Sequence, residues 1–269
     1  MNTSDTLLML GRDHAVYGEI SRGSLGPVAA RLSVGADAES PSLAFKADKA
    51  LPNEDALLVK RSGDLYLLVV ADAHFGHQAS HLLLERLAER QLPRRGPGEE
   101  GAASELMELC LSVQRPHQSS RSGTTLLVAL YASRTGRVLA LSTGDSTLGT
   151  LSPAGWRVRN EHNHSYLRLD LPSYPDEWDL TEFTLEPGSL LILHTDGVDE
   201  CHYRQPETSI RSRHMESLWK GLPSEPYESL ELRAGRFSEA LTRMALEGVD
   251  GHPGGQDNIA LLVLAHPGA

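Results

Sequence analysis

Five aspartates stand at the ends of apolar segments that have the length and composition of buried strands. Three of them follow such a segment: Asp72, Asp145 and Asp196. The other two, Asp55 and Asp257, come before one. One aspartate in this position is typical of a turn, but several like charges brought together repel one another unless a cation neutralises them. Carboxylate oxygens suit hard cations, so the pattern predicts a site for Mg²⁺ or Mn²⁺.

The strands that would carry these acids are short runs rich in leucine, valine and isoleucine. The strongest are Leu65–Ala71, Thr124–Ala132, Arg137–Ser142, Ser189–His194 and Asn258–Ala265, with further strands at Ala29–Val34, Ala56–Val59, Trp156–Val158 and Thr181–Leu185. The short turn between Ala132 and Arg137 predicts an antiparallel hairpin. Helical periodicity predicts three helices, over Gln78–Gln91, Ala102–Val113 and Leu230–Leu246. Because hairpins come in groups and strands do not alternate regularly with helices, the pattern favours a layered α+β fold.

Length and charge narrow the classes of function. The chain has 269 residues, which corresponds to one large domain or two small ones. With 25 Lys and Arg against 36 Asp and Glu, its formal net charge of −11 disfavours binding to nucleic acid or to an anionic membrane. Two cysteines, no basic leader and no long apolar stretch predict a cytoplasmic protein without a transmembrane helix. The cysteines and histidines also lack the paired spacing of a structural zinc site.

Four blocks of sequence occur in a recognisable order. They are Asn53-Glu54-Asp55-Ala56, then Val70-Ala71-Asp72-Ala73-His74-Phe75-Gly76-His77, then Ser122-Gly123-Thr124-Thr125-Leu126 continued by Gly144-Asp145-Ser146, and Thr195-Asp196-Gly197-Val198 paired with Gly255-Gln256-Asp257-Asn258-Ile259. In content and order they resemble the bacterial type-2C metal-dependent Ser/Thr protein phosphatases, the PPM family. The resemblance covers residues 53–264, roughly four fifths of the chain, and is carried by the order of the blocks.

The resemblance implies an α+β fold of four layers, an α/β/β/α sandwich in which two antiparallel sheets pack together and helices flank them. The whole chain, 1–269, would form one phosphatase domain, with its motifs within about 29–266. The polar segments 160–179 and 203–228 are expected to be irregular surface excursions within that domain.

The resemblance also implies a centre of two Mn²⁺ or Mg²⁺ ions in a cleft at one end of the sandwich. Asp72 would bridge both ions. The other expected ligands are Asp196 and Asp257 at one ion, and Asp55 with the main-chain carbonyl of Ala73 at the other. The residues expected around them are Glu54 behind the ligands, Asp145 with Glu200 as its candidate partner at a weaker third ion, and Asn258 as an orienting residue.

The reaction implied is hydrolysis of phosphoserine and phosphothreonine monoesters on a protein substrate. The substrate is expected to be a bacterial protein phosphorylated by a protein kinase. The cations would offset the negative charge of the phosphate and supply a metal-bridged hydroxide for in-line attack. His74 matches the general-acid position of the family and would protonate the leaving alkoxide. The alternative for His74 is a histidine at the surface or near the metals without a catalytic role.

The second block departs from the family pattern at two glycine positions, which here are Ala73 and Phe75. Ala73 can present its carbonyl if its backbone angles are ordinary, whereas a positive φ would cost an alanine about 1 kcal/mol. Phe75 would add an aromatic wall beside the cleft and narrow substrate access.

The family's phosphate-binding arginine is replaced by Ala50. Lys49 is the nearest cation, and it either binds the phosphate as a point charge or is a solvated loop residue. Arg204 belongs to a cationic patch with Arg211, Arg213 and His214, which either meets a phosphopeptide or is a solvated loop.

Two other functions remain open at this stage. The departures at Ala73 and Phe75 and the missing arginine would suit a non-catalytic regulatory module, although no core acid is lost. The second is a metal-dependent hydrolase of small phosphate esters. Serine-hydrolase chemistry is disfavoured because Gly144-Asp145-Ser146 is not a Gly-x-Ser-x-Gly elbow, and the chain has no phosphate-binding P-loop.

Overall fold

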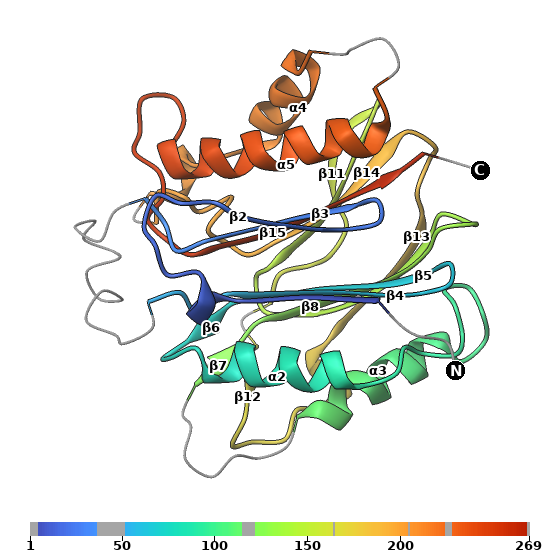
Figure 1. Cartoon of the computed structure of the whole chain (residues 1–269). Helices are drawn as coiled ribbons and strands as arrows, with labels where there is room; N and C mark the ends of the chain where they lie inside the picture. The colour runs from blue at the N-terminus through green and yellow to red at the C-terminus, as the bar shows by residue number, and fades with distance from the viewer. Residues whose placement is uncertain are drawn as a thin grey trace.

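Two antiparallel sheets pack face to face between two layers of helices (Figure 1). The computed structural model describes residues 5–36, 52–114, 122–163, 165–203, 205–223 and 228–267. The α+β fold of four layers expected from the sequence is confirmed.

The first large sheet has the strand order β1-β4-β5-β8-β9-β13, and every neighbouring pair is antiparallel. Its strands are β1 (Asp5–Leu10), β4 (Ala56–Ser62), β5 (Leu65–Ala71), β8 (Leu126–Ala132), β9 (Arg137–Thr143) and β13 (Asp179–Thr184). The hairpin predicted between Ala132 and Arg137 is confirmed, because these residues face each other at the start of the β8–β9 ladder.

The second large sheet is also antiparallel and has the order β11-β10-β14-β15-β3-β2. Its strands are β11 (Gly155–Val158), β10 (Thr147–Ser152), β14 (Ser189–His194), β15 (Ile259–His266), β3 (Val28–Ser33) and β2 (Ser21–Leu25). A small third sheet pairs β12 (Leu167–Arg168), β7 (Gly123–Thr124) and β6 (Ala73–His74) in that order.

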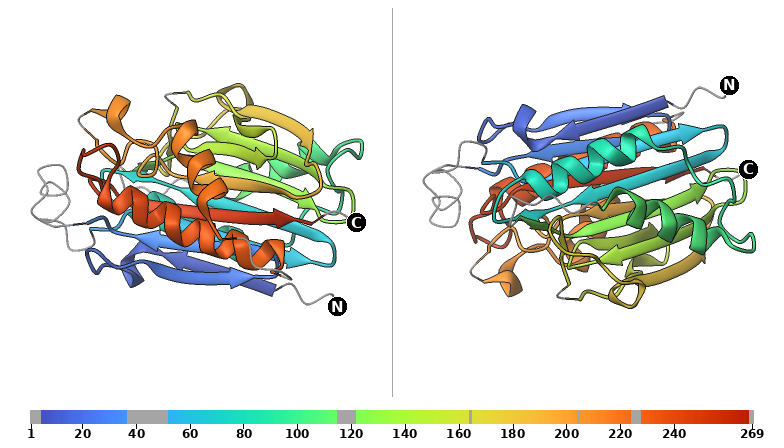
Figure 2. Two further views of the ribbon diagram at one scale, coloured as in Figure 1. Left: turned by 90° about the horizontal axis from the view of Figure 1, so that it is seen from above. Right: turned by 90° about the horizontal axis from the view of Figure 1, so that it is seen from below.

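Helices cover the outer face of each large sheet (Figure 2). α2 (Gln78–Glu89) and α3 (Ala102–Val113) lie on the first sheet, whereas α5 (Leu230–Glu247) lies on the second with α4 (Ser212–Gly221) beside it. Short 3₁₀ turns occur at η1 (Gly11–Asp13), η2 (Pro175–Glu177) and η3 (Pro206–Thr208). No helix within the described ranges is both long and apolar enough to cross a membrane.

Three hydrophobic cores separate the four layers. In β5, for example, Leu68 and Val70 belong to the core between the sheets, whereas Leu67 and Val69 belong to the core under α2 and α3. Successive side chains of a strand point to opposite faces, so a strand buried on both faces reads as a continuous apolar run. This explains why the inner strands were the easiest to predict.

Several elements differ from the sequence-based expectation. The segment 203–228 was expected to be irregular, but it contains the helix α4. The strand predicted over Thr124–Ala132 is two strands, β7 and β8, interrupted at Thr125. The strand β10 was missed because Gly149 breaks its apolar pattern. A Cβ at Gly149 would lie 2.0 Å from the ring of Trp156, so glycine is required for the two strands to pack.

The ends of the described chain lie opposite the small sheet (Figure 1). β1 begins and β15 ends at one end of the sandwich, and β6 of the small sheet lies at the opposite end.

Candidate active site

Both large sheets present their aspartates at the same end of the sandwich. In the first sheet, Asp55 directly precedes β4 and Asp72 directly follows β5, and these neighbouring strands are antiparallel. In the second sheet, Asp196 follows β14 and Asp257 precedes its neighbour β15. The hydroxyl of Thr195 donates a hydrogen bond to Asp55 Oδ2 at 2.7 Å. Because Thr195 follows β14 and Asp55 precedes β4, this bond joins the acid-bearing ends of the two sheets.

Asn258 makes a second link between the sheets. Its side-chain oxygen accepts from the main-chain N–H of Glu54, and its amide group donates to the carbonyl of Val34, both at 2.9 Å. Its own main-chain N–H donates to Asp257 Oδ1 at 2.7 Å. These contacts hold Asn258, the residue next to Asp257, against the segments that carry Glu54 and Val34.

Two threonines hold the main chain at Asp72. The carbonyl of Asp72 accepts from the N–H of Thr125 and from the hydroxyl of Thr124, both at 2.8 Å. The N–H of Asp72 donates to Thr125 Oγ1 at 3.0 Å. The Ser-Gly-Thr-Thr block therefore fixes the point at which the buried Asp72 leaves β5, and this is also where the predicted strand Thr124–Ala132 divides.

Tyr166 lies among three of the predicted acids, and sequence reasoning did not find it. Its hydroxyl makes a hydrogen bond to the side chain of Asp145. Burial raises the pKa of Tyr166 to about 12, and the charges of Asp145, Asp72 and Asp196 add to the effect. The pairing of β12 with β7 brings Tyr166 to this position. Its only sequence signal was an aromatic side chain inside the polar segment 160–179.

Glu200 extends the acid cluster. Burial raises the pKa of Glu200, and the charges of Asp199, Asp145 and Asp257 raise it further. The main-chain N–H of Glu200 donates to the carbonyl of Asp196 at 2.6 Å. The charge of Asp145 therefore acts on Glu200, and the pairing of the two residues at a third ion stays a prediction.

Ala73 and His74 form β6, which directly follows Asp72 and pairs with β7. The ring of His74 meets the ring of Tyr166 edge-on, with the ring centroids 4.6 Å apart. Among the described residues, the non-glycine positions with positive φ are Phe75 and Asp250, so Ala73 replaces glycine without backbone strain. In this block the positive φ, and with it the backbone strain, is at Phe75, where φ is 62°, and not at Ala73.

His81 supports the acid end from α2. Its Nε2 lies 3.3 Å from the main-chain oxygen of Asp55, and the side chain is buried. Burial lowers the pKa of His81 to about 4, with a further contribution from His77. His81 is therefore neutral at pH 7 and contacts the main chain that carries Asp55.

The two residues predicted to bind the substrate phosphate, Lys49 and Arg204, lie outside the described residues. Two described members of the expected cationic patch have partners within the protein. Arg213 and His214 both contact Asp250 Oδ2, at 2.5 and 3.1 Å. In this arrangement both side chains are engaged with Asp250 rather than held open for a phosphopeptide.

The donor atoms at the acid end suit a hard divalent cation. They are carboxylate and main-chain oxygens, and Asp145 Oδ1 is buried and accepts no hydrogen bond from the described part of the chain. Across the described residues, no three Asp, Glu, His or Cys side chains converge closely enough to hold an ion by themselves. Ion binding would therefore draw the carboxylates together or add carbonyl and water ligands, as magnesium sites commonly do.

The model of the family described as protein phosphatase 2C matches residues 45–233. The chain belongs to the protein phosphatase 2C family. This membership confirms the enzyme class expected from the sequence, a protein serine/threonine phosphatase.

Several solved structures share the fold of this phosphatase. The catalytic domain of the serine/threonine phosphatase PstP, in complex with two manganese ions, is 19% identical, with a TM-score of 0.61 over 88% of this chain and 96% of that one. The serine/threonine phosphatase PstP/Ppp of Mycobacterium tuberculosis is 21% identical, with a TM-score of 0.60 over 89% and 98%. RsbX in complex with magnesium is 16% identical, with a TM-score of 0.54 over 91% and 98%. A search of curated proteins found no match.

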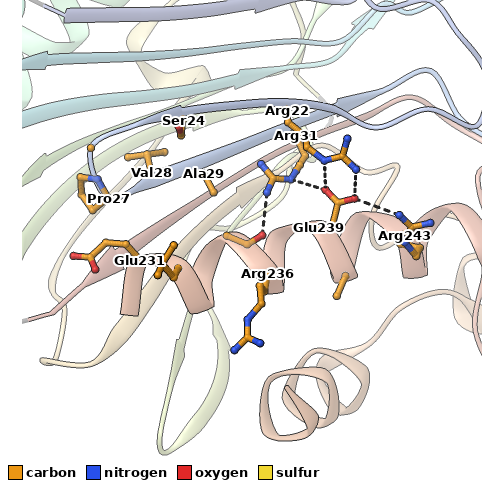
Figure 3. A pocket seen from close by; sticks show the side chains of 14 residues that line it. Arg22, Ser24, Pro27, Val28, Ala29, Arg31, Glu231, Arg236, Glu239 and Arg243 are labelled. Atoms are coloured by element: carbon orange, nitrogen blue, oxygen red, sulfur yellow. Dashed lines mark hydrogen bonds and ion pairs between the residues drawn. The ribbon is translucent and has the colours of Figure 1, made fainter. Parts of the chain in front are cut away.

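A groove of about 720 Å³ lies elsewhere on the phosphatase, between α5 and the strands β2 and β3 (Figure 3). Within it Glu239 accepts hydrogen bonds from Arg22, Arg31 and Arg243. Hydrogen bonding to Arg22 is the largest cause that lowers the pKa of Glu239. Because these arginines converge on Glu239, the cluster ties the edge of the second sheet to α5, and we assign it a structural role.

Proposed function

We propose that this phosphatase hydrolyses phosphoserine and phosphothreonine monoesters on protein substrates, with two Mn²⁺ or Mg²⁺ ions at the acid end. The observation that carries this proposal is the hydrogen bond from Thr195 to Asp55, because it brings the acids of both sheets together. The metals in the PstP and RsbX structures, manganese and magnesium, support the same assignment.

Oxygen ligands from both sheets would hold the ions. The proposed set is Asp55, Asp72, Asp196, Asp257 and the main-chain carbonyl of Ala73, with Asp72 as the bridging ligand and Asp145 beside Glu200 at a weaker third ion. When bound, the ions would offset the charge of the phosphate and lower the pKa of the attacking water. Since each sheet supplies part of the set, the whole chain works as one catalytic domain.

His74 is the proposed general acid. An alkoxide is a poor leaving group, and a positioned imidazolium can deliver a proton to it as the P–O bond breaks. The edge-on contact with Tyr166 limits how far the His74 ring can turn, and Tyr166 is itself held by Asp145. This chain of contacts keeps the acid close to the carboxylate cluster.

The proposed substrates are phosphoproteins made by a bacterial protein kinase, and the proposed compartment is the cytoplasm. Cys110 and Cys201 are both buried and not in a disulfide, which suits a reducing compartment. The PstP and PstP/Ppp structures are of serine/threonine phosphatases, which supports the substrate class.

The test of this function is phosphate release from a phosphothreonine peptide and from p-nitrophenyl phosphate, with Mn²⁺, Mg²⁺ or EDTA. Activity should require a metal, and Asp72→Asn should lower kcat by about 10³-fold because the bridging charge is lost. The matched control is Asp64→Asn, in the β4–β5 turn at the opposite end of the strands, which should leave kcat unchanged.

Circular dichroism and thermal melting should show that both variants are folded. A folded wild-type protein that binds Mn²⁺ and releases phosphate from neither substrate would contradict the proposed function. That result would favour the non-catalytic regulatory module.

A further inference from the structure

Phe75 combines an unfavourable backbone with an exposed aromatic side chain. Its φ of 62° lies in the left-handed region, which a glycine adopts readily and a bulky residue does not. Its side chain is 87% exposed, the highest value among the exposed large hydrophobic residues of the described chain. The residue therefore gains almost nothing from burial and carries backbone strain as well.

Neighbouring contacts hold this strained turn in place. On its N-terminal side, His74 belongs to β6 and pairs with Gly123 of β7. On its C-terminal side, the carbonyl of Gly76 accepts a hydrogen bond from the hydroxyl of Ser122, and Ser122 also accepts from the N–H of Ala79 at 3.2 Å. The turn is thus tied to β7 and to the start of α2 on either side of Phe75.

The folded state alone gives no reason for phenylalanine at this position. A glycine would relieve the strain, and a polar residue would remove exposed apolar surface from water. Residues held in sparsely populated backbone regions cluster at functional sites, where the surrounding structure fixes them. Phe75 directly follows His74, the last residue of β6, so this exposed residue lies at the end of the sandwich that carries the acids.

We propose that Phe75 is a specificity-determining residue that contacts the substrate segment and favours an apolar side chain next to the phosphorylated serine or threonine. This inference rests on the proposed phosphatase function. Adjacent residues of an extended chain are about 3.3–3.6 Å apart, so a residue one or two positions from the phosphorylated one is within reach of the ring beside His74. Tyr166, 40% exposed and in contact with His74, adds a second aromatic surface at this end.

The experiment compares wild type and Phe75→Gly on two phosphothreonine peptides that differ only in the flanking residue, leucine or glycine, and on p-nitrophenyl phosphate. Wild type should prefer the leucine peptide by about three- to tenfold in kcat/KM, the range expected for one aromatic–apolar contact. Phe75→Gly should lose this preference through KM and keep its turnover of p-nitrophenyl phosphate. Its melting temperature should be equal to or up to about 3 °C above that of wild type, because glycine relieves the strain.

Leu232→Ala is the matched control. Leu232 lies on α5, is 65% exposed, and lines the groove between α5 and the strands β2 and β3. Replacement of Leu232 by alanine should change neither the preference between the two peptides nor the turnover of p-nitrophenyl phosphate. The control separates a contact at Phe75 from a general effect of removing exposed apolar surface.

The possible failures can be told apart. If p-nitrophenyl phosphate is hydrolysed but wild type and Phe75→Gly rank the peptides alike, the inference about Phe75 is wrong and the phosphatase function stands. If Phe75→Gly melts several degrees lower and loses activity on every substrate, Phe75 has a structural role and the inference is also wrong. If wild type turns over no substrate with any metal, the proposed function fails and the inference falls with it.

Discussion

His74 is the residue proposed to protonate the leaving alkoxide. It is half-buried, belongs to a two-residue strand and meets Tyr166 edge-on. Tyr166 in turn interacts with Asp145, so two residues from other parts of the chain, one directly and one through it, position the imidazole of His74. The role proposed for His74 can be tested separately from the role of the metals. A general acid is needed when the leaving group is a basic alkoxide, and it is not needed when the leaving group departs without a proton.

Replacement of His74 by asparagine should lower kcat on a phosphothreonine peptide by about 10²-fold, because an alkoxide needs a proton to leave. Turnover of p-nitrophenyl phosphate should change by less than about threefold, since nitrophenolate leaves without one. Steady-state kinetics on both substrates, with Asp64→Asn as the control at the opposite end of the strands, check this expectation. Equal losses on the two substrates would assign His74 to metal or substrate binding instead.

At the same scale, the sequence predicted roles for the acids, for Ala73 and for Asn258, but it assigned no role to Thr195 or Tyr166. Asp55, Asp72 and Asp257 stood out because a charge at the end of an apolar run has few structural explanations. Thr195 and Tyr166 did not stand out, because threonine and tyrosine are common in ordinary strands and loops. Their roles come from contacts across the two sheets and the small third sheet, which local patterns cannot reveal.

The helices and strands also divide into those that the sequence predicted and those that it missed. β5, β14 and α3 have the predicted bounds, because each carries an uninterrupted apolar run or a clear helical stripe. The short strands β6 and β12 were not predicted, since two residues contain no periodicity. The helix α4 was missed because its buried face is small, with Met215 as its fully buried residue.

Lys60 gives a prediction for one junction between elements. It lies on β4 and is buried, and its Nζ donates to the carbonyls of Ala88, at 2.7 Å, and of Arg90, at the C-terminal end of α2. Lys60→Met should lower the free energy of unfolding by about 1–3 kcal/mol, because the terminal carbonyls of the helix lose their donor.

Urea denaturation measures the loss at Lys60. The control is Lys220→Met on α4, where an exposed lysine lies 3.5 Å from Glu216 and its removal should cost less than about 0.5 kcal/mol. An equally small effect at Lys60 would mean that water satisfies the end of α2.

Across the whole molecule, polar contacts between the sheets occur at both ends. Thr195 and Asn258 join them at the acid end. At the opposite end, the hydroxyl of Tyr131 on β8 hydrogen-bonds to Nδ1 of His266 at the end of β15, at 2.8 Å. The apolar core between the sheets is thus closed by hydrogen bonds at both ends, which fixes how the sheets align.

His266 makes stability depend on pH. Burial lowers its pKa below the ordinary value of about 6.5, so the folded protein resists a proton that the unfolded chain accepts. The stabilising contribution is complete above pH 6.5 and is lost as the pH falls towards the lower pKa of the folded state. The free energy of unfolding should therefore decline as the pH falls below about 6.5, by at most about 1.4 kcal/mol per pH unit for one group.

In His266→Gln this decline should be shallower, as urea denaturation at several pH values would show. It should not vanish, because the depressed pKa of His81 acts in the same direction. Identical slopes for the variant and the wild type would mean that His266 takes up its proton without cost in the folded protein.

The direction of the first and last strands, β1 and β15, has a practical consequence for attachment. β1 begins at Asp5 and β15 ends at His266, both at the end of the sandwich away from the acids. A solid support, label or fused recognition module joined there would sit about one strand length, roughly 25 Å, from the site of hydrolysis. It would leave that site open to large phosphoproteins. A substrate tethered at the same place would need a linker of about eight or more extended residues to reach it.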